Sequence, residues 1–281
     1  MKNDKSKIKE SLQSYCERYG SQNKAAASLQ GVSSATISQV LNDNWELIND
    51  KMWMSIAAQI GFKKDEWIVV ETRGFKIMNL LLTDSKLYHL TSAIVGNAGK
   101  AGKTESIKSF EESNKDVYFL SCAEYWNRKL FLVELLQKIG KPTSGLTVGE
   151  LMNEIIKEIK KKENPIIIMD EADKLSDQVL YFFITLYNQL EDHCGIIICA
   201  TKYLEKRFKK GLRLGKKGYE EICSRIVNKF IEIPDANSTD IYSICVSNGI
   251  SDRKRIDEII KDSDFDLRRV KKMIHASKRS I

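Results

Sequence analysis

The feature that most constrains how this chain can fold is a glycine-rich segment that directly follows an apolar run. The run Ser92-Ala93-Ile94-Val95 predicts a buried strand. It leads into Gly96-Asn97-Ala98-Gly99-Lys100-Ala101-Gly102-Lys103-Thr104, after which the pattern predicts a helix. A strand, a glycine-rich loop, Gly-Lys-Thr and a helix are the context of a P-loop, in which backbone N–H groups surround phosphate. We therefore expect residues 96–104 to bind ATP, with Lys103 on the β- and γ-phosphates and the Thr104 hydroxyl on Mg²⁺.

The spacing of the glycines departs from the usual P-loop pattern. In GxxxxGK[ST] the first glycine lies five residues before the second, whereas Gly96 lies six residues before Gly102. Asn97 occupies the usual position of the first glycine. Two explanations are open: the loop contains one additional residue, or Asn97 replaces the glycine because asparagine tolerates a positive φ.

A second apolar run ends in two carboxylates. Residues 164–169 predict a strand, which is followed directly by Asp170 and Glu171. Carboxylates in this position complement Gly-Lys-Thr, because Asp170 can hold Mg²⁺ and Glu171 can polarise the attacking water. A third apolar strand, residues 195–200, ends at Thr201. We expect the Thr201 side chain either to reach the γ-phosphate or the water, or to cap the next helix.

Residues 8–62 have helical apolar spacing and no alternating pattern. Within them, residues 23–29, a break at Gly31 and residues 33–41 resemble a helix-turn-helix of the phage-repressor type. Gly31 allows a left-handed turn, Ser33 or Ser34 can cap the second helix, and buried apolar residues would anchor it. A plain helical hairpin is the alternative. Serine, glutamine and asparagine can contact phosphate or base edges, so the candidate DNA contacts are Ser33, Ser34, Ser38, Gln39 and Asn42.

Composition excludes several classes of protein. The chain has 281 residues, 42% hydrophobic and 30% charged, with 3 Pro and 15 Gly, which is globular rather than fibrous or low-complexity. Its apolar runs are far shorter than the roughly 20 residues of a membrane span, and its first residues do not form a secretory signal. The 6 Cys and 3 His are dispersed without a CxxC pair, so we expect no disulfide framework, no zinc site and a cytoplasmic location.

The formal net charge of +7 is unevenly distributed along the chain. Residues 202–229 contain ten basic and three acidic side chains, and residues 267–281 contain six basic and no acidic ones. Clustered cations favour a nucleic acid partner, here double-stranded DNA bound largely without sequence preference, over a plain solvated surface. Further candidate phosphate contacts flank the second and third strands: Arg128, Lys129, Lys160, Lys161 and Lys162.

Strand and helix patterns alternate over the middle of the chain. Strands are predicted at 90–95, 117–121, 165–169, 195–200 and 229–233, with helices at 128–139, 147–162, 177–190 and 217–227. This alternation predicts an α/β fold with a parallel sheet covered on both faces. Residues 238–248, 252–261 and 266–277 predict three further helices. We expect a helix-turn-helix module over 1–64, with a boundary near residues 63–66, a nucleotide-binding core over 65–234 and a helical lid over 235–281.

Taken in order, these motifs resemble the AAA+ transposition ATPases. The helix-turn-helix pattern, Gly-Lys-Thr at 102–104, Met-Asp-Glu-Ala-Asp at 169–173, the strand ending at Thr201 and Ser-Arg-Ile at 224–226 are similar to the phage Mu transposition protein B family. The transposon regulator TnsC and the insertion-sequence helper IstB are its relatives. The resemblance covers roughly residues 5–280 and implies an AAA+ P-loop core.

The resemblance also implies roles for single residues. Thr201 falls at the position of the sensor 1 polar residue, and Arg225 at that of an arginine finger which reaches the site of a neighbouring subunit. Arg207 and Arg213 are alternatives for the finger. Arg268 resembles the sensor 2 arginine, with Arg269 as its rival, although Phe265 stands where a glycine is usual.

The implied function is that of a DNA-binding ATPase with slow, DNA-stimulated hydrolysis. Such a protein would assemble with ATP as a homo-oligomeric ring or helical filament on duplex DNA, recruit and activate a DDE-type transposase, and disassemble after hydrolysis. A helicase loader and a repressor-like DNA binder with a nucleotide switch are the alternatives. The N-terminal pattern favours the transposition regulator over the loader, and the complete set of site residues argues against an inactive switch.

Overall fold

The computed structural model describes residues 2–62, 67–226 and 230–279. The chain divides into two compact units, Met1–Trp67 and Ile68–Ile281, and each is described by itself. The expected boundary at 63–66 lies outside the described residues, as do the first residue of the fifth predicted strand and the last residue of the helix predicted at 217–227.

The first unit is helical throughout its described residues. Leu12, Ile37, Val40 and Ile56 are fully buried in its core. Trp53 is buried and meets Trp45 edge-on with 5.5 Å between ring centroids. The elements are α1 (Lys2–Tyr19), α2 (Gln22–Ser28), α3 (Ser34–Leu41), the 3-10 turn η1 (Trp45–Leu47) and α4 (Asp50–Gln59).

The connection between α2 and α3 turns at Gly31. The φ of Gly31 is 69°, in the left-handed region that glycine adopts without steric cost. The backbone N–H of Thr36 donates to Ser33 Oγ at 3.1 Å, so Ser33 rather than Ser34 caps α3. Ile37 and Val40 point into the core from the same helix. The sequence predicts these local features correctly.

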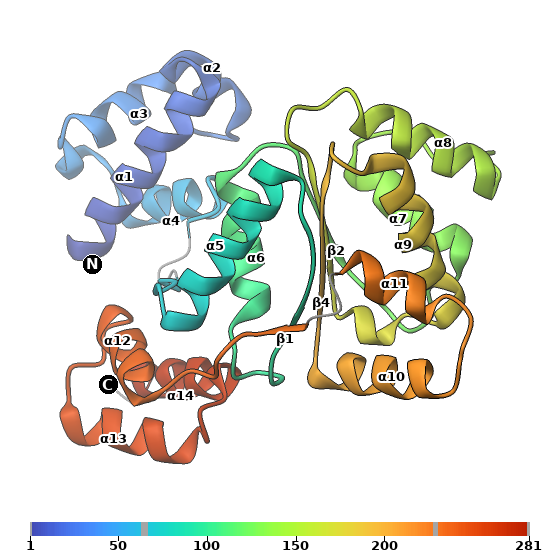
Figure 1. Cartoon of the computed structure of the whole chain (residues 1–281). Helices are drawn as coiled ribbons and strands as arrows, with labels where there is room; N and C mark the ends of the chain where they lie inside the picture. The colour runs from blue at the N-terminus through green and yellow to red at the C-terminus, as the bar shows by residue number, and fades with distance from the viewer. Residues whose placement is uncertain (1, 63–66, 227–229, 280–281) are drawn as a thin grey trace. The chain divides into compact units, whose positions relative to one another are not determined.

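The second unit is built around a five-stranded sheet with the order β2-β3-β4-β1-β5. Every pairing is parallel, so the carboxyl ends of the strands form one edge of the sheet. The predicted α/β fold with a parallel sheet is therefore confirmed (Figure 1). The strands are β1 (Thr91–Val95), β2 (Val117–Ser121), β3 (Ile166–Asp170), β4 (Gly195–Ala200) and β5 (Phe230–Glu232).

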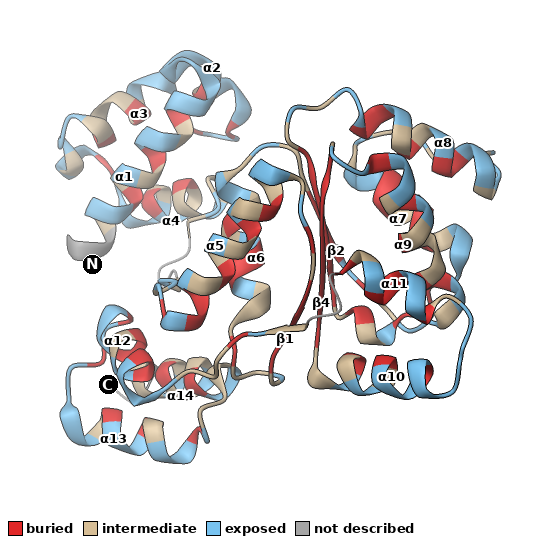
Figure 2. Ribbon diagram, viewed as in Figure 1, coloured by how far each residue is buried: buried red, intermediate tan, exposed pale blue. Residues whose placement is uncertain are grey.

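Helices cover both faces of this sheet (Figures 1 and 2). Ile166 and Ile168 of β3 pack with α5 and α6, whereas Ile167 and Met169 pack with the helices of the other face. This alternation along one strand explains why its residues 166–169 are all apolar. One face carries α5 (Arg73–Tyr88) and α6 (Lys103–Ser113); the other carries α7 (Arg128–Lys138), α8 (Val148–Ile159), α9 (Asp177–Leu190), α10 (Lys202–Arg213) and α11 (Tyr219–Arg225).

Three helices follow the sheet: α12 (Ser238–Ser247), α13 (Arg253–Asp262) and α14 (Leu267–Arg279). Buried Ile241, Ile259 and Ile274 lie one on each of them. The segment contacts the glycine-rich loop, because the backbone N–H of Ala236 donates to the Lys100 carbonyl at 2.9 Å. None of the described helices is long and apolar enough to cross a membrane.

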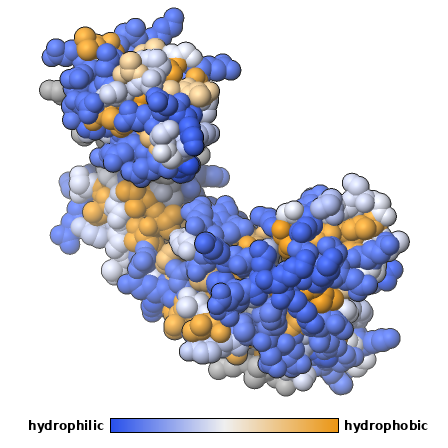
Figure 3. All heavy atoms as spheres, turned by 90° about the horizontal axis from the view of Figure 1, so that it is seen from above, coloured by the Kyte–Doolittle hydropathy of each residue, from blue (hydrophilic) through white to orange (hydrophobic). Residues whose placement is uncertain are grey.

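The observed elements differ from the predicted ones mainly at their ends. Helix α8 begins at Val148 because Thr147 is its N-cap in a reciprocal capping box with Glu150. Strand β3 extends to Asp170, which places this carboxylate in the sheet. Two helices, α5 and α10, cover stretches for which the sequence analysis predicts no element. On the face seen in Figure 3, hydrophobic residues form separate patches among hydrophilic ones.

Candidate nucleotide site and DNA contacts

The glycine-rich loop connects β1 to α6 and bends at two glycines. Gly99 (φ 74°) and Gly102 (φ 66°) have left-handed backbone. A Cβ atom on Gly99 would lie 2.5 Å from an Asp266 carboxylate oxygen, so a side chain there would require Asp266 or the loop to move. Asn97 is not among the described residues with positive φ, so the proposed replacement of a left-handed glycine by Asn97 is wrong. Its amide is used otherwise, donating to Asp235 Oδ2 at 2.8 Å.

Carboxylates from the C-terminal segment hold this loop from outside. Besides Asp235, Asp264 forms an ion pair with Lys100 at 3.0 Å. The backbone N–H of Leu267 donates to the Gly99 carbonyl at 2.8 Å. The sequence analysis missed these contacts, since partners such as Lys100 and Asp264 lie 164 residues apart and no spacing pattern connects them.

Lys103 is the first residue of α6. Its Nζ donates to the Gly96 carbonyl at 2.9 Å, which places the ammonium group inside the bend of the loop. Burial lowers the pKa of Lys103 from its ordinary value, and the charge of Asp170 opposes this shift. An anion bound in the loop would stabilise the charged form of this lysine further.

Thr104 and Asp170 join the loop to the end of β3. Thr104 Oγ1 donates to Asp170 Oδ2 at 2.6 Å, and the backbone N–H of Glu171 donates to Oδ1 at 2.9 Å. Burial raises the pKa of the Asp170 carboxyl, and the two hydrogen bonds oppose that rise. A hydroxyl and a carboxylate oxygen suit Mg²⁺, which keeps several water ligands and takes few from the protein. Among the described residues, no group of three or more His, Cys, Asp or Glu could hold a metal ion.

Glu171 lies beside this pair with a left-handed backbone, φ 56°, which is unusual for glutamate. Such conformations are often found at functional sites. Its side chain is 38% exposed and Oε2 accepts from Lys174 Nζ at 2.7 Å within the turn η2 (Ala172–Lys174). The carboxylate is therefore both fixed by an ion pair and accessible to water.

Thr201 follows β4 and is the N-cap of α10. The backbone N–H of Tyr203 donates to Thr201 Oγ1 at 3.3 Å. The same hydroxyl donates to Asp173 Oδ2 at 2.8 Å, which connects the end of β4 to the turn after Glu171. The capping role is thus observed, and contact with a γ-phosphate stays a prediction.

Arg225 lies away from these residues within the chain. It ends α11, before β5, whereas the loop and Asp170 lie at the carboxyl ends of the strands. Its guanidinium donates to Asn188 Oδ1 at 2.7 Å and to the Glu221 carbonyl at 2.8 Å, and it lies 5.4 Å from the ring centroid of Tyr187. The structure therefore does not bring Arg225 to the site of its own subunit.

Arg268 and Arg269 are exposed in the first turn of α14. Their backbone N–H groups donate to Asp266 Oδ1 at 2.8 and 3.2 Å, so this turn adjoins the glycine-rich loop through Asp266. Phe265 has a φ of 59°. A left-handed backbone at this position gives a physical reason why glycine is the usual residue there.

The candidate DNA contacts of the first unit lie on or beside α3. Ser34 and Asn42 are exposed, and Ser38 and Gln39 are half-buried. Ser33 is exposed but its hydroxyl is already used as the cap of α3. Asn42 Nδ2 donates to Ser38 Oγ at 3.1 Å, so these two side chains form a pair on the helix surface.

The candidate DNA contacts of the core fall into two separate groups. Arg128 and Lys129 are exposed at the start of α7, which follows the carboxyl end of β2. Lys160 and Lys161 follow α8, before the amino end of β3. Lys161 forms an ion pair with the buried Glu158. The structure therefore places the two groups at opposite edges of the sheet.

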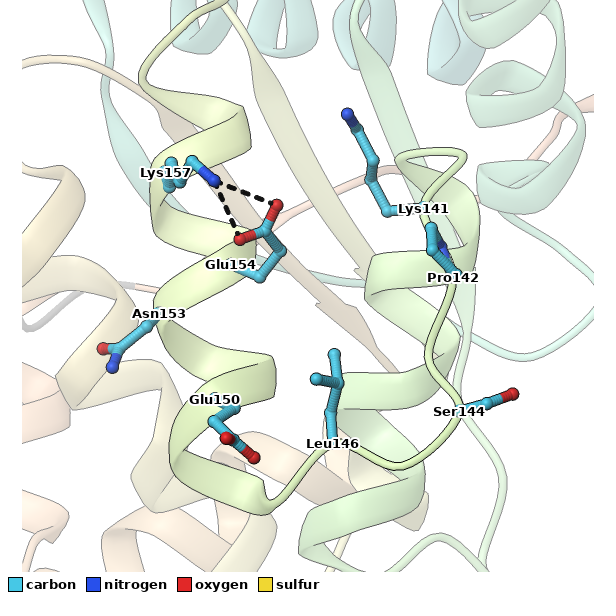
Figure 4. A pocket seen from close by; sticks show the side chains of 8 residues that line it. All are labelled: Lys141, Pro142, Ser144, Leu146, Glu150, Asn153, Glu154 and Lys157. Carbon is cyan, nitrogen blue, oxygen red and sulfur yellow. Dashed lines mark hydrogen bonds and ion pairs between the residues drawn. The ribbon is translucent and has the colours of Figure 1, made fainter.

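A cavity of about 470 Å³ lies between α8 and the segment that precedes it (Figure 4). None of its lining residues belongs to the glycine-rich loop or to the strand ends. Glu154 and Lys157, which line it, neutralise each other at 3.2 Å. This cavity is separate from the nucleotide site.

The fold and the site define a P-loop ATPase. Residues 88–208 match the family model described as an AAA domain, and this match covers β1, the glycine-rich loop, β3 and Thr201.

The chain is also similar to the ATP-dependent target DNA activator B of Escherichia phage Mu, with 25% identity over 262 residues that cover 90% of this chain and 81% of that protein. It is 25% identical to the protein of the same name from Escherichia phage D108 over 185 residues, which cover 62% of this chain and 58% of that protein. The resemblance given by the motifs is confirmed, and the protein is an ATPase.

Proposed function

We propose that this ATPase assembles with ATP on target duplex DNA, recruits and activates a DDE-type transposase there, and leaves the DNA after slow hydrolysis. The observation that carries the proposal is the contact between Thr104 and Asp170 beside Lys103, within a chain that is similar to a target DNA activator over 262 residues. The name of that relative includes both ATP dependence and target DNA.

In this proposal different residues of the chain bind the phosphates, orient the attacking water and hold the metal ion. The loop N–H groups and Lys103 bind the β- and γ-phosphates, and Glu171 orients the attacking water and accepts its proton. Thr201 and Arg268 contact the γ-phosphate from β4 and α14. Thr104 and Asp170 would hold Mg²⁺, which when bound neutralises charge on the phosphate oxygens.

Assembly is expected because the proposed arginine finger, Arg225, does not lie at the site of its own subunit. Arg225 is held against α9 within its subunit, so its finger role requires a neighbouring site. A guanidinium there gains a charge-assisted contact only while the γ-phosphate is present. Hydrolysis removes that contact, and the assembly then weakens.

DNA binding is proposed for both units of the chain. Ser34, Ser38, Gln39 and Asn42 of the helix-turn-helix module would contact bases or phosphates, with Ser33 fixing the start of the helix. Exposed cations of the core, including Arg128 and Lys129, would supply binding without sequence preference.

The test compares wild type with Lys103→Ala and Glu171→Gln for ATP binding, turnover and duplex-dependent sedimentation. Lys103→Ala should lose ATP binding and assembly, since no other described cation lies inside the bend of the loop. Glu171→Gln should bind ATP and assemble on duplex DNA but turn over at most about 1% as fast, because a general base contributes roughly 10²–10⁴-fold.

The transposase role is tested by strand transfer into DNA carrying the Glu171→Gln assembly. Wild type that hydrolyses ATP without binding duplex DNA would contradict the proposal, and delivery of a replicative helicase would favour the loader alternative. Sequence-specific binding of monomers, independent of ATP, would favour the repressor-like alternative.

A further inference from the structure

Helix α10 presents cations on one face and is packed firmly on the other. Leu204, Phe208 and Gly211 form the buried face. A Cβ atom on Gly211 would lie 2.5 Å from the Tyr219 ring, so α10 and α11 approach each other as closely as a glycine allows. The opposite face therefore has a fixed position in the second unit.

That opposite face carries Lys206, Lys210 and Arg213, which we call the α10 stripe. Their spacing of four and three residues places them in line along the helix. Arg213 and Lys210 are exposed and Lys206 adjoins them. From Lys206 to Arg213 the helix rises about 10 Å, the length of roughly three nucleotides of one DNA strand.

The stripe has no acidic partner among the residues that the structure describes. Lys209, on the flank of the helix, pairs instead with Glu205 at 2.7 Å. Two lysines of the basic group at 160–162 have acidic partners: Lys161 pairs with Glu158, which Lys141 also contacts at 3.0 Å, and Lys162 pairs with Asp116 at 3.0 Å. The structure thus distinguishes basic segments that look equivalent in the sequence.

Like charges three and four residues apart destabilise a helix by roughly 0.2–0.5 kcal/mol per pair. Lys206 and Lys210 form one such pair, and Lys210 and Arg213 form another. An anionic partner that spans the stripe would attract all three cations and so offset the repulsion between them.

The composition of the stripe favours a phosphate backbone over a protein surface. Lysine is depleted in protein–protein interfaces, whose centres are apolar and aromatic, whereas rows of lysine and arginine neutralise successive phosphates. We infer that the α10 stripe is a duplex-DNA contact of this protein, and that Lys161 and Lys162 are not. This inference rests on the DNA binding in the proposed function and assigns a surface to it.

The experiment measures binding of a 30-base-pair duplex by fluorescence anisotropy, with a non-hydrolysable ATP analogue, from 0.05 to 0.3 M salt. The variant is Lys206→Ala/Lys210→Ala, and the matched control is Lys161→Ala/Lys162→Ala, which removes the same charge. Arg213 stays intact because it is an alternative finger.

Loss of two phosphate contacts should reduce the slope of log K against log salt by about 1.8 and affinity at 0.15 M salt by roughly 30-fold. The control should keep the wild-type slope. ATP-analogue binding should be the same in all three proteins. The α10 variant should fold at least as stably as wild type, since alanine is the best helix former and the repulsion is removed.

The possible results distinguish a failure of the α10 contact from a failure of DNA binding as a whole. No duplex binding by wild type would overturn both. Wild-type binding by the α10 variant, or equal losses in variant and control, would overturn the inference alone. Sedimentation also tests whether the α10 variant assembles when DNA is absent. If it does not, the DNA contact is overturned and the stripe is assigned to a contact between subunits.

Discussion

At the scale of single residues, Gly99 combines two constraints in one backbone position. Its φ of 74° favours glycine, and a Cβ atom there would lie 2.5 Å from Asp266. Many glycines of this chain meet only the first constraint; Gly145, with φ 78°, has open space around its Cβ position. Gly99 is therefore needed for the shape of the glycine-rich loop, whereas Gly145 is needed only for a turn.

Gly99→Ala should reduce ATP affinity by about tenfold or more, a change of about 1.4 kcal/mol, because the loop or Asp266 must move. Gly145→Ala should share the cost of a left-handed alanine, about 1–2 kcal/mol of stability, but keep wild-type ATP affinity. Calorimetric titration with ATP and thermal unfolding of both variants measure the two effects. Equal ATP affinities would show that Asp266 does not constrain the loop.

At the scale of elements, a half-buried polar cluster joins α9, α10 and α11. Arg207 pairs with Asp177 and donates to the Leu175 carbonyl at 2.7 Å, and Tyr219 Oη donates to Asp177 Oδ1 at 2.7 Å. Burial alone would raise the pKa of Asp177, but the hydrogen bonds from Arg207 and Tyr219 lower it overall. Since Arg207 is held inside its own subunit, it is a poor alternative for the arginine finger.

Asp177→Asn should destabilise the second unit by about 1–2 kcal/mol at pH 7, a modest value because Asp177 is partly solvated. A lowered pKa in the folded state stabilises the protein above the ordinary pKa of 3.8 and is lost as the pH falls below it. The difference between the wild-type and variant free energies of unfolding should therefore shrink from pH 7 to pH 3.5. Urea titrations across this range measure it, and a constant difference would contradict an ionised Asp177 as the cause.

At the scale of the whole molecule, Arg225 is the residue whose proposed role requires a second copy. Its guanidinium shares Asn188 within the chain, which provides a matched control. Truncating either partner removes the hydrogen bonds between them, worth about 1 kcal/mol. Truncating Arg225 also removes its hydrogen bond to the Glu221 carbonyl and its contact with the Tyr187 ring. Only truncation of Arg225 removes a cation that a neighbouring site could use.

Arg225→Ala should bind ATP like wild type but fail to form large assemblies on duplex DNA, and its turnover should fall by roughly 10³-fold, as expected for loss of an arginine finger. Asn188→Ala should assemble and hydrolyse like wild type. Analytical ultracentrifugation with an ATP analogue and DNA, together with phosphate release, measures both. Normal assembly by Arg225→Ala would exclude this finger, and a loss shared with Asn188→Ala would assign the defect to local packing.

The sequence by itself determined the parts of this protein that depend on short spacing. Apolar runs located β1, β3 and β4, Gly-Lys-Thr located the loop between β1 and α6, and the carboxylate after an apolar run located Asp170 at the end of β3. These predictions succeed because backbone conformation and strand burial are local properties of a few consecutive residues. The parallel sheet then brings Thr104 to Asp170, since both follow strands of one direction.

Only the tertiary structure decided which polar groups meet across long stretches of chain. It showed that Asp235 and Asp264 hold the glycine-rich loop, that Arg207 is held in an ion pair with Asp177, and that Lys161 has an acidic partner whereas the α10 stripe has none among the described residues. In the sequence all basic residues contribute the same formal charge. Whether a charge is available to a partner depends on the distance to the nearest opposite charge, and that distance is set by the packing of elements far apart in the chain.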